Sequence, residues 1–483
     1  MPKNIKSITN PKLQLNILTP QEVEKIHSST LWIIEKVGVR FPSKRALKIW
    51  ADHGAEIDAE KMVVRAKPEL IEKALKSCPP VYPLAARDPA QDLPLDGNHV
   101  FVGTDGCGVE VLDIQSGTRR TSCLQDVRDI ARIADATEEI GFHWVPVSAQ
   151  DRPPETRSLH EIQAIWENST KHVQTESIYT EREARAAVEM AALLVGGKDK
   201  LRARPVLSLM QCSASPLGHD GGSLDAALVA AEYGLPTGFM TMAANLTTGP
   251  ATLAGNLAVG NAEVIAGAAL IQLAFPGAPV FYAAAQTASD LRTGAYTGGG
   301  PEDFLYGAAT NVLSDFYHIP LSMGSFATGA KEPNWQAGIE NTLSTFMACI
   351  SMSDMLLGVG LLHGSRIWSF SEMMMDCEIF STIHKTLQGI VVDDETLALD
   401  TIAAVGSGGN FLTQKHTLKH MRDIFLPQFM DRRPYTEWET KKDDARDWAL
   451  AKARKTLETH QPDPLDEGVR AEMARIIASL EKK

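Results

Sequence analysis

The stretch PVFYAAAQTASDLRTGAYTGGGPEDFLYGAATNVLSDFYHIPLSMGSF (279–326) contains one complete unit of the pattern that decides the fold. It begins with a short apolar run, passes through a loop rich in glycine, threonine and aromatic residues, and continues into an Ala/Leu-rich segment before the next apolar run. The same succession occurs eight times between His99 and Leu387. A repeated strand, loop and helix of this kind is typical of parallel α/β proteins.

The eight apolar runs predict eight buried strands. They start near Val100, His143, His172, Pro205, Pro236, Pro279, Pro320 and Asp354. Successive starts lie 29 to 43 residues apart, which leaves room for one helix after each strand, since a strand-plus-helix crossover needs roughly 30 residues. The runs lack clean alternation, as expected for strands buried on both faces. We therefore predict an α/β fold, a closed (β/α)8 or TIM barrel. An open doubly wound sheet is the alternative, because periodicity alone cannot show closure.

The 483-residue chain is longer than a barrel requires, since roughly 250 residues are enough. We expect an N-terminal helical extension over residues 1–98, the barrel over 99–392 and a C-terminal helical segment over 393–483. Three helices are expected in the first segment, at 19–39, 44–54 and 67–77. The helices of the last segment are expected to pack on the barrel.

Composition excludes several classes of function. The net charge of −13 is spread over the whole length, which argues against a nucleic-acid partner and fits either a cationic substrate or simple solubility. The six cysteines form no C-x-x-C pair, so neither a disulfide framework nor a zinc knuckle is indicated. The start lacks a signal-peptide apolar core and no run resembles a membrane span, so a cytoplasmic protein is expected.

Motifs for metal-dependent or nucleophilic hydrolysis are missing from the sequence. We find no H-E-x-x-H, no phosphate-binding Gly-x-Gly loop after a late strand and no evident Ser/His/Asp order. His416 and His420 are four residues apart, as in a zinc helix, but they lack the glutamate base and lie beyond the barrel. Surface or core packing is the simpler interpretation of this pair, and we predict no metal site.

In a barrel of this kind the active site lies over the carboxyl ends of the strands, so only the loops after the strands need to be searched. Aromatic residues fall at or just past strands six to eight, namely Tyr282, Tyr296, Phe326, Trp335 and Trp368. Aromatic faces attract a quaternary ammonium group by about 0.5 to 2 kcal/mol each. The other interpretation, which we favour for Tyr282 and Trp335 taken singly, is that they fill the barrel mouth or its helix contacts.

One loop stands out because it combines three kinds of side chain. Trp368 lies beside Arg366 and His363, after the eighth strand has ended and before the next helix, capped by Ser371, begins. His363 is the only histidine directly after a barrel strand. We expect it to contact substrate rather than to serve as a hydrogen-bonded structural histidine.

Five blocks of the sequence resemble a known protein family. They are TGPATLAGNLAVGNAEVIAG (248–267), SDLRTGAYTGGGPED (289–303), KEPNWQAGIENTLS (331–344), WSFSEMMMDCEI (368–379) and DDETLALDTIAAVGSGGNFLTQKHTLKHMRDIF (393–425). Together and in this order they resemble the MttB-type trimethylamine methyltransferase family. The resemblance implies a (β/α)8 barrel. It also implies transfer of a methyl group from a methylated amine to the Co(I) of a corrinoid (cobalamin-type) cofactor carried by a partner protein. By analogy with the family, a homo-oligomer is expected.

The sequence departs from the founding members of that family at one point. Those members carry pyrrolysine after a late strand, whereas the corresponding region here, GSFATGAKEPN (324–334), consists of ordinary residues. The resemblance is therefore to the pyrrolysine-lacking branch, whose substrates are quaternary amines such as glycine betaine. Methyl loss from a quaternary ammonium releases a neutral tertiary amine, so no general acid is required. We accordingly assign no catalytic residue, and positioning of the substrate becomes the main task.

A betaine would also need a partner for its carboxylate. Arg292, Arg366, Lys331 and His363 are the candidates, although Arg292 could instead pair with Asp290 or Asp303 to shape its loop. Gln286 could donate a hydrogen bond across the mouth. Glu176, late in the third strand, could help to neutralise a cation if it faces inward, and would be only an ion-pair partner if it faces a helix.

Two other functions are compatible with these loops. Lys331 after the seventh strand could form a Schiff base, which would make the protein a lyase. Alternatively, the protein could bind quaternary amines without turning them over. Borohydride trapping on Lys331 would identify the lyase, and ligand-dependent stabilisation without methylation of Co(I) would identify the binding protein.

Overall fold

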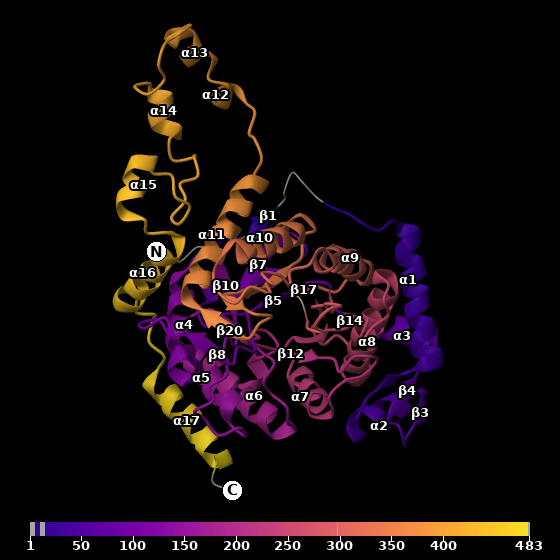
Figure 1. The fold of residues 1–483 in the computed structure, drawn as a ribbon. Coiled ribbons are helices and arrows are strands. Elements are labelled where there is room, and N and C mark those ends of the chain that lie inside the picture. Colours follow the sequence, from indigo (N-terminus) through magenta and orange to yellow (C-terminus); the bar gives the residue numbers. More distant parts are fainter. Residues whose placement is uncertain (1–4, 10–14, 297, 482–483) are drawn as a thin grey trace.

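The protein is a closed eight-stranded parallel barrel surrounded by helices (Figure 1). The computed structural model describes residues 5–9, 15–296 and 298–481. The barrel strands are β7 (His99–Thr104), β10 (Ile140–Trp144), β11 (His172–Thr175), β12 (Leu207–Cys212), β13 (Thr237–Thr241), β15 (Val280–Ala284), β17 (Leu321–Gly324) and β18 (Met355–Val359). Parallel pairing of β18 with β7 closes the sheet. The predicted barrel is confirmed, and the open doubly wound alternative is wrong. Thr297 and both chain ends, which the sequence analysis included in its segments, lie outside the described residues.

The second strand differs most from its predicted start. It begins at Ile140 rather than His143, whereas the other seven begin within two residues of the predicted positions. Ile140 and Phe142 pair with Val102 and Gly103 of β7. Pairing with the neighbouring strand, which a local run of residues does not reveal, therefore sets this start.

Alternate strand residues fill the barrel interior. Its inward-facing side chains include Phe101, Phe142, Trp144, Met210, Met240, Phe281, Met355 and Leu357. A hairpin of β5 (Tyr82–Leu84) and β6 (Leu93–Leu95) adds four buried side chains to the same cluster. The Tyr82 hydroxyl donates to the carbonyl of Val280 (2.7 Å), at the start of β15. The N-terminal extension thus closes the barrel at the end where the strands begin, and leaves the opposite end open.

Eight helices alternate with the strands. They are α4 (Leu124–Ala136), α5 (Arg157–Asn168), α6 (Glu181–Val195), α7 (Gly221–Glu232), α8 (Leu253–Ala274), α9 (Pro301–Tyr317), α10 (Trp335–Ile350) and α11 (Phe370–Leu387). Among the described residues, α8 is the one helix long and apolar enough to span a membrane, and 83% of its most apolar window is buried inside the protein. It lies between the strands β13 and β15 and the N-terminal helices. A helix covered on both sides is expected to be apolar all round.

The N-terminal extension supplies the outer cover of α8. Its helices α1 (Pro20–Trp32), α2 (Lys44–Asp52) and α3 (Pro68–Leu75) lie close to the three predicted positions and contact α8. Between them the chain forms a small sheet of β2 (Val39–Arg40), β3 (Glu56–Asp58) and β4 (Val63–Arg65) that the sequence analysis did not predict. Strands of two or three residues are too short for hydrophobic periodicity to reveal.

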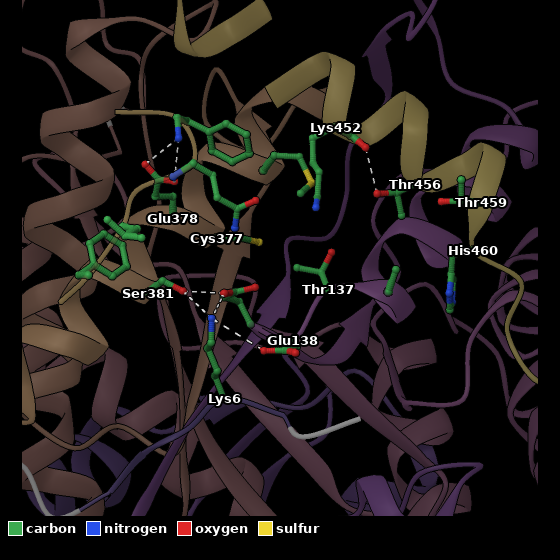
Figure 2. A pocket seen from close by; sticks show the side chains of 17 residues that line it. Lys6, Thr137, Glu138, Cys377, Glu378, Ser381, Lys452, Thr456, Thr459 and His460 are labelled. Atoms are coloured by element: carbon green, nitrogen blue, oxygen red, sulfur yellow. Dashed lines mark hydrogen bonds and ion pairs between the residues drawn. The ribbon is translucent and has the colours of Figure 1, made fainter. Parts of the chain in front are cut away.

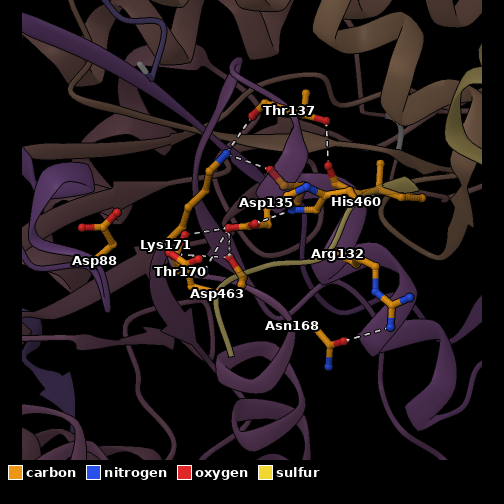
Figure 3. Close-up of polar contacts among 12 residues, drawn as sticks. Asp88, Arg132, Asp135, Thr137, Asn168, Thr170, Lys171, His460 and Asp463 are labelled. Atoms are coloured by element: carbon orange, nitrogen blue, oxygen red, sulfur yellow. Dashed lines mark hydrogen bonds and ion pairs between the residues drawn. The ribbon is translucent and has the colours of Figure 1, made fainter. Parts of the chain in front are cut away.

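The last two helices hold the C-terminal segment against the barrel. Helix α16 (Ala445–Thr459) packs on α11 and α4, and α17 (Glu467–Glu481) packs on α6 and α5. His460, directly after α16, lies 2.6 Å from a carboxylate oxygen of the buried Asp135 at the end of α4 (Figure 3). Expected packing on the barrel is thus found for α16 and α17.

A buried lysine caps the same end of α4. The Lys171 ammonium donates to the carbonyls of Ala134 and Thr137, both at 2.7 Å, and to that of Ile140 (Figure 3). A positive charge at a helix C-terminus satisfies its last carbonyls and interacts favourably with the helix dipole. Lys171 therefore stabilises the junction between α4 and β10.

Four short helices of the C-terminal segment do not pack on the barrel. They are α12 (Asp394–Leu397), α13 (Leu399–Val405), α14 (Lys415–His420) and α15 (Tyr435–Lys441), and none contains a buried residue. In Figure 1 they project away from the barrel beyond the end of α11. The expectation that all helices of this segment pack on the barrel is wrong here, because an amphipathic pattern shows only that a face needs cover and not what covers it. The division of the chain at residues 98/99 and 392/393 stays a prediction.

The loop after β18 is held by a small sheet above the barrel. Its strands are β19 (Leu361–Leu362), β20 (Ile367–Ser369), β8 (Glu110–Leu112) and β9 (Arg119–Thr121). Strands β8 and β9 form a hairpin after the first barrel strand, and β20 pairs parallel with β8. The loops that follow the first and the last strand are therefore joined by backbone hydrogen bonds.

A buried pair of carboxyl groups supports the end of β18. The amide of Asn341 donates to both Glu372 (2.9 Å) and Asp376 (2.8 Å), and Asp376 also accepts the backbone N–H of Gly360 (2.9 Å). Burial raises the pKa of Glu372 to about 7, and burial together with the charge of Glu372 raises the pKa of Asp376. At least one of the two carboxyl groups is therefore protonated at neutral pH.

We expect Glu372→Gln to gain stability relative to the wild type as the pH rises. With a pKa raised by folding, Glu372 contributes its stabilisation fully below the unfolded-state pKa of about 4.3 and loses it as the pH rises through about 7. The glutamine is neutral throughout. The difference in free energy of unfolding should change between about pH 5 and pH 8 by up to about 1.4 kcal/mol per pH unit. Urea unfolding at several pH values measures this difference, and a constant difference would contradict the raised pKa of Glu372. Glu458→Gln, at an exposed site, is the control and should show no such trend.

Candidate active site

Two cavities are candidates for the site, and they lie at different places on the barrel. One, of about 490 Å³, lies outside the strands between α4, α11 and α16 (Figure 2). Lys6 there pairs with Glu139 and donates to Ser381 (3.0 Å). Glu378 accepts backbone N–H groups of Phe429 (2.9 Å) and Met430 (3.0 Å). These contacts attach terminal segments to the barrel, far from the strand ends at which barrel enzymes place their chemistry.

The other cavity, of about 470 Å³, opens at the carboxyl ends of the strands. Its lining includes Asp105, Cys107, Trp144, Cys212, Met240, Met242, Ala285, Tyr296, Gly324, Ser325, Ala327, Leu357, His363, Ser365 and Arg366. These residues lie on or just after seven of the eight strands, β11 being the exception. Its volume lies within the usual range for small-molecule sites. We take this cavity as the candidate active site.

Asp105 places a carboxylate in the wall of the cavity. It follows β7 directly, is almost fully buried, and accepts hydrogen bonds from the Ser365 hydroxyl (2.7 Å) and the Gly106 N–H (2.9 Å). Burial raises its pKa to about 6, against the opposing effect of these two donors. Asp105 is therefore mostly ionised at neutral pH, and it can neutralise a bound cation.

Glu176 lies beside the cavity and differs from Asp105 in protonation state. Its carboxyl group shares a hydrogen bond with the Cys107 thiol, and burial raises its pKa to about 8. The Asp105 charge acts in the same direction. Glu176 is consequently protonated at neutral pH and adds no negative charge to the cavity.

Aromatic and thioether side chains form much of the remaining wall. Trp144 faces the barrel interior together with Met210 and Met240. Tyr296 reaches the cavity from the loop after β15, where its hydroxyl donates to the carbonyl of Ala285 (3.1 Å). Electron-rich rings near a carboxylate provide an environment suited to a cation without hydrogen-bond donors.

The loop after β18 forms the rim of the cavity in an uncommon backbone conformation. His363, Gly364 and Ser365 have φ values of +58°, +61° and +61°. Such values are uncommon for residues with a side chain and cost about 1 kcal/mol or more each. Hydrogen bonds from the backbone N–H of His363 to Ala330 (2.7 Å) and of Gly364 to Thr328 (2.9 Å) hold the loop in place. This backbone conformation keeps the Ser365 hydroxyl on Asp105 and places His363 and Arg366 at the rim.

Arg366 and His363 supply the polar side of the rim. Within the described part of the chain, no hydrogen bond or ion pair involves the Arg366 guanidinium. Partial burial and the charges of Lys331 and Arg366 lower the pKa of His363, which favours the neutral ring at pH 7. The rim can therefore bind an anionic group through Arg366, with His363 as a neutral hydrogen-bonding neighbour.

A wider cleft of about 960 Å³ continues outward from this rim. It shares Tyr296 and His363 with the inner cavity and is also lined by Arg292 and Lys331. The Arg292 guanidinium pairs with Asp290 (2.9 Å), whose pKa falls to about 2 through this contact and neighbouring backbone N–H groups. Asp290 also accepts the N–H groups of Arg292 and Thr293. Arg292 thus takes part in shaping its own loop.

Five of the residues singled out from sequence lie away from the cavity. Tyr282 is fully buried and donates to Asn261 of α8 (3.2 Å), so it faces the helix layer. Trp368 is fully buried against Phe370, with ring centroids 6.5 Å apart. Phe326 is buried in the outer core, and Gln286 donates to the carbonyl of Asn256 (2.8 Å) on α8. The exposed Trp335 opens α10 and lines neither the cavity nor the cleft.

Sequence reasoning missed Asp105 and Trp144. Both fall within predicted strand runs and were treated there only as parts of strands. Alternation along the strands was the usable signal: Phe101 and Phe142 face inward, so residues 105 and 144 follow on the same face. The same count places Tyr282 outward, because its neighbour Phe281 faces inward.

The site combines one carboxylate, two aromatic rings and one unpaired guanidinium, and it has few groups suited to proton transfer. Glu176 is protonated, and burial raises the pKa of Cys212 far above neutrality, so this thiol stays protonated too. The arrangement can hold a zwitterion, with its cationic end at Asp105 and its anionic end at Arg366. It favours positioning over proton transfer.

Comparisons with known proteins give a consistent result. The chain matches the family described as trimethylamine methyltransferase (MTTB) over residues 1–483. It is 33% identical over 464 residues to the trimethylamine methyltransferase MttB of Desulfitobacterium hafniense (strain DSM 10664 / DCB-2), covering 95% of this chain and 93% of that protein. It is also 33% identical over 471 residues to the glycine betaine methyltransferase of Desulfitobacterium hafniense (strain Y51), covering 97% and 98%.

Among solved structures, the monomethylamine methyltransferase of Methanosarcina barkeri is similar with a TM-score of 0.51, covering 91% of this chain and 92% of that one. The two sequences are 12% identical, so this likeness shows a shared fold alone. The family match, by contrast, spans the barrel and both extensions. The chain therefore belongs to the trimethylamine methyltransferase (MTTB) family, as its sequence blocks suggested.

Proposed function

We propose that this protein transfers a methyl group from a quaternary amine, glycine betaine or a related betaine, to the Co(I) of a corrinoid carried by a partner protein. The observation that carries the proposal is a single cavity with a carboxylate, Asp105, in its wall and an unpaired guanidinium, Arg366, at its rim. A betaine has a matching cation and anion. The relatives named for trimethylamine and for glycine betaine support a methylated amine as substrate.

The inner end of the cavity suits the trimethylammonium group. Such a group has no N–H to donate, so recognition relies on charge and on aromatic faces. Asp105 supplies the charge, and Trp144 and Tyr296 supply the faces. Small residues after β17, namely Gly324, Ser325 and Ala327, leave space where a larger side chain would fill the cavity. This wall lies in the segment where the founding family members carry pyrrolysine.

The rim suits the carboxylate of the substrate. Arg366 offers a planar set of donors that fits a carboxylate, and His363 lies two residues before the Ser365 that holds Asp105. Binding both ends would fix the direction of the N–CH3 bonds. We therefore assign substrate positioning to Asp105, Trp144, Tyr296, His363 and Arg366, and no longer assign it to Tyr282, Phe326, Trp368 or Gln286. Arg292 and Glu176 are placed beside the site.

The proposed methyl transfer does not require the protein to transfer a proton. When the methyl group leaves, the C–N bonding pair stays on nitrogen and gives a neutral tertiary amine, so no side chain has to donate a proton. The corrinoid of the partner supplies a strongly nucleophilic Co(I). The protein's own residues hold the ammonium in one orientation, exclude water from around it and keep one face open, which lowers the barrier mainly through orientation.

The outer cleft fits the approach of a corrinoid-bearing partner. It is open, continues directly into the cavity and is lined by Leu246 and Leu291, both exposed. Exposed apolar side chains around an opening are typical of an interaction surface. We propose this cleft as the docking face, and a cytoplasmic location for the pair of proteins. We propose no resident metal ion.

The Schiff-base lyase gains no support from the position of Lys331. Its ammonium donates to the carbonyl of Gly329 (2.5 Å) and lines the outer cleft rather than the inner cavity. A lysine that forms Schiff bases is usually desolvated in an apolar pocket. A binding protein without turnover would share the same cavity, and the first experiment below separates it from a methyltransferase.

Anaerobic mixing with cob(I)alamin and a panel of amines tests the proposed reaction. We expect loss of the Co(I) absorbance with glycine betaine or another betaine, and little or none with trimethylamine, because trimethylamine has no carboxylate for Arg366 to bind. Reaction with trimethylamine alone would refute the quaternary-amine assignment. Binding of betaines, measured by calorimetry, without loss of Co(I) in the presence of the cognate corrinoid protein would favour the binding protein.

Asp105→Asn should weaken binding of glycine betaine by about 10- to 100-fold, because a buried charge pair contributes a few kcal/mol. Since the pKa of Asp105 is about 6, wild-type affinity should fall as the pH drops below that value, by up to tenfold per unit. The asparagine variant should lose this dependence. Isothermal titration across the pH range measures both effects without a corrinoid. Glu332→Gln, a carboxylate change on the exposed loop after β17, is the matched control. A Kd of the Asn variant equal to that of wild type would remove Asp105 from the site.

Arg366→Ala should discriminate between ligands with and without a carboxylate. We expect a loss of about 10-fold or more in affinity for glycine betaine, since a charge-assisted bidentate contact is removed. Affinity for tetramethylammonium, which lacks the carboxylate, should change less than about twofold by the same reasoning. Titration of both ligands against both proteins measures this difference. An equal loss for the two ligands would show that Arg366 acts on the shape of the cavity rather than on the carboxylate.

A further inference from the structure

Residues 389–441 form an arm that leaves the barrel after α11 and returns at α16 (Figure 1). The arm contains the four short helices α12 to α15, none of which buries a residue. Isolated helices of four to seven residues are not stable in water, because most helical stability comes from packing. Contacts other than those with the barrel therefore have to hold these helices in place.

Three side chains of the kind that bind metal ions meet where α12 and α14 approach each other. Glu395 lies on α12, and His416 and His420 lie four residues apart on α14. The carboxylate of Glu395 and the two rings each offer one ligand atom, and these three atoms lie within 4.8 Å of one another. In the part of the chain that the structure describes, this is the one group of three such side chains that comes so close.

The separations within this cluster approach those of a metal site. Nε2 of His420 lies 3.1 Å from Oε1 of Glu395, and the two histidine rings have their centres 4.4 Å apart. Zinc lies about 2.0–2.2 Å from nitrogen and oxygen ligands in a tetrahedral arrangement, so its ligand atoms are about 3.3 Å apart. Small rotations of side chains at the surface close the longer separations of the cluster.

The second ring nitrogen of His420 already has a partner. Nδ1 lies 2.7 Å from a carboxylate oxygen of Asp423. A carboxylate behind a liganding histidine is common in protein metal sites, where it sets the tautomer and orients the ring. With Nδ1–H donating to Asp423, Nε2 carries the lone pair that a metal ion needs, and it faces Glu395.

One lysine competes for the same carboxylate. Nζ of Lys419 donates to Oε1 of Glu395 (2.6 Å), and the two side chains are 62% and 52% exposed. An exposed ion pair of this kind contributes about 0–1 kcal/mol. Two imidazoles and a carboxylate bind a transition-metal ion more strongly than that. The lysine therefore moves into solvent when the ion binds, and its charge lowers the affinity of the site.

A cleft beside the cluster gives an ion access from solvent. It has a volume of about 280 Å³, and its lining includes Glu395 and His416 together with Asp394 and Asp400. The additional acidic side chains favour entry of a cation. Three protein ligands leave at least one coordination position, which water fills from this open side.

We propose that Glu395, His416 and His420 bind a divalent transition-metal ion and that this ion joins α12 to α14. Imidazole and carboxylate ligands together suit Zn²⁺ and similar ions, whereas Mg²⁺ and Ca²⁺ prefer oxygen ligands alone. Sequence reasoning treated the two histidines as a packing pair because the third ligand lies on another helix, twenty-one residues before His416.

The inference does not depend on the proposed methyl transfer, which needs no resident metal ion. None of the three ligands lines the inner cavity or the outer cleft at the barrel mouth. The ion would act on the arm alone, where it would replace a weak surface ion pair by a connection between two short helices.

Titration of the metal-free full-length chain with Zn²⁺, followed by calorimetry, tests the proposal. The wild type should bind one ion per chain at this site. His416→Ala and His420→Ala should each weaken binding by at least about tenfold, and Asp423→Asn by about tenfold, the usual effect of losing the partner of a ligand. Lys419→Gln should bind Zn²⁺ more tightly than the wild type, because it removes the competing charge.

Limited trypsin digestion measures the effect of the ion on the arm. Lys415, Lys419 and Arg422 are exposed, so trypsin should cut beside them in the metal-free chain. Saturating Zn²⁺ should slow this cleavage, since the ion holds α14 against α12. In the double variant His416→Ala/His420→Ala, Zn²⁺ should leave the rate of cleavage unchanged.

A matched control and three outcomes decide the proposal. His53→Ala, at an exposed histidine that ends α2, should bind Zn²⁺ as the wild type does. A wild type that binds no Zn²⁺ would overturn the proposal. Binding that survives the double histidine variant would overturn it too, because the ion would then be held elsewhere, for example by the cavity thiols. Weaker binding by Lys419→Gln would likewise contradict it, because a competing charge cannot support the site.

Discussion

Closure of the barrel between its last and first strands is the constraint on which the site depends. Met355 and Leu356 of β18 pair with Phe101 and Val102 of β7, and the register then shifts before Val359 meets Thr104. This pairing brings together segments some 260 residues apart. The Asp105 N–H donates to the carbonyl of Val359, and its carboxylate accepts the Ser365 hydroxyl, only because the two strand ends are neighbours. Without closure there would be no common wall for a cation and an anion.

The acidic groups at the mouth differ in protonation state. Asp105 keeps its charge because Ser365 and Gly106 donate to it, whereas burial and the nearby charge of Asp105 hold Glu176 neutral. Two carboxyl groups that follow β7 and β11, with β10 between them, thus take different states at one pH. A cavity with one negative group, aromatic walls and a guanidinium at its rim is suited to holding a zwitterion while a reagent approaches from the open side.

The two extensions complement the barrel in different ways. The N-terminal one closes the strand starts with its hairpin and covers α8, which explains why that helix is apolar on all sides. The C-terminal one is anchored through α16, α17 and the His460–Asp135 contact, whereas its four short helices α12 to α15 project from the barrel with apolar side chains exposed.

The sequence by itself determined the eight strand-helix units, the order of the extensions and the family, because these depend on local periodicity and on short ordered blocks of residues. It also identified His363, Arg366 and Tyr296 by their position after strands. Only the tertiary structure decided that Asp105 and Trp144 share their cavity, that Tyr282 and Trp368 face away from it, and that helices α12 to α15 do not pack on the barrel. Each of these depends on strand register and on contacts between distant segments, and a one-residue change of register sends a side chain to the opposite face.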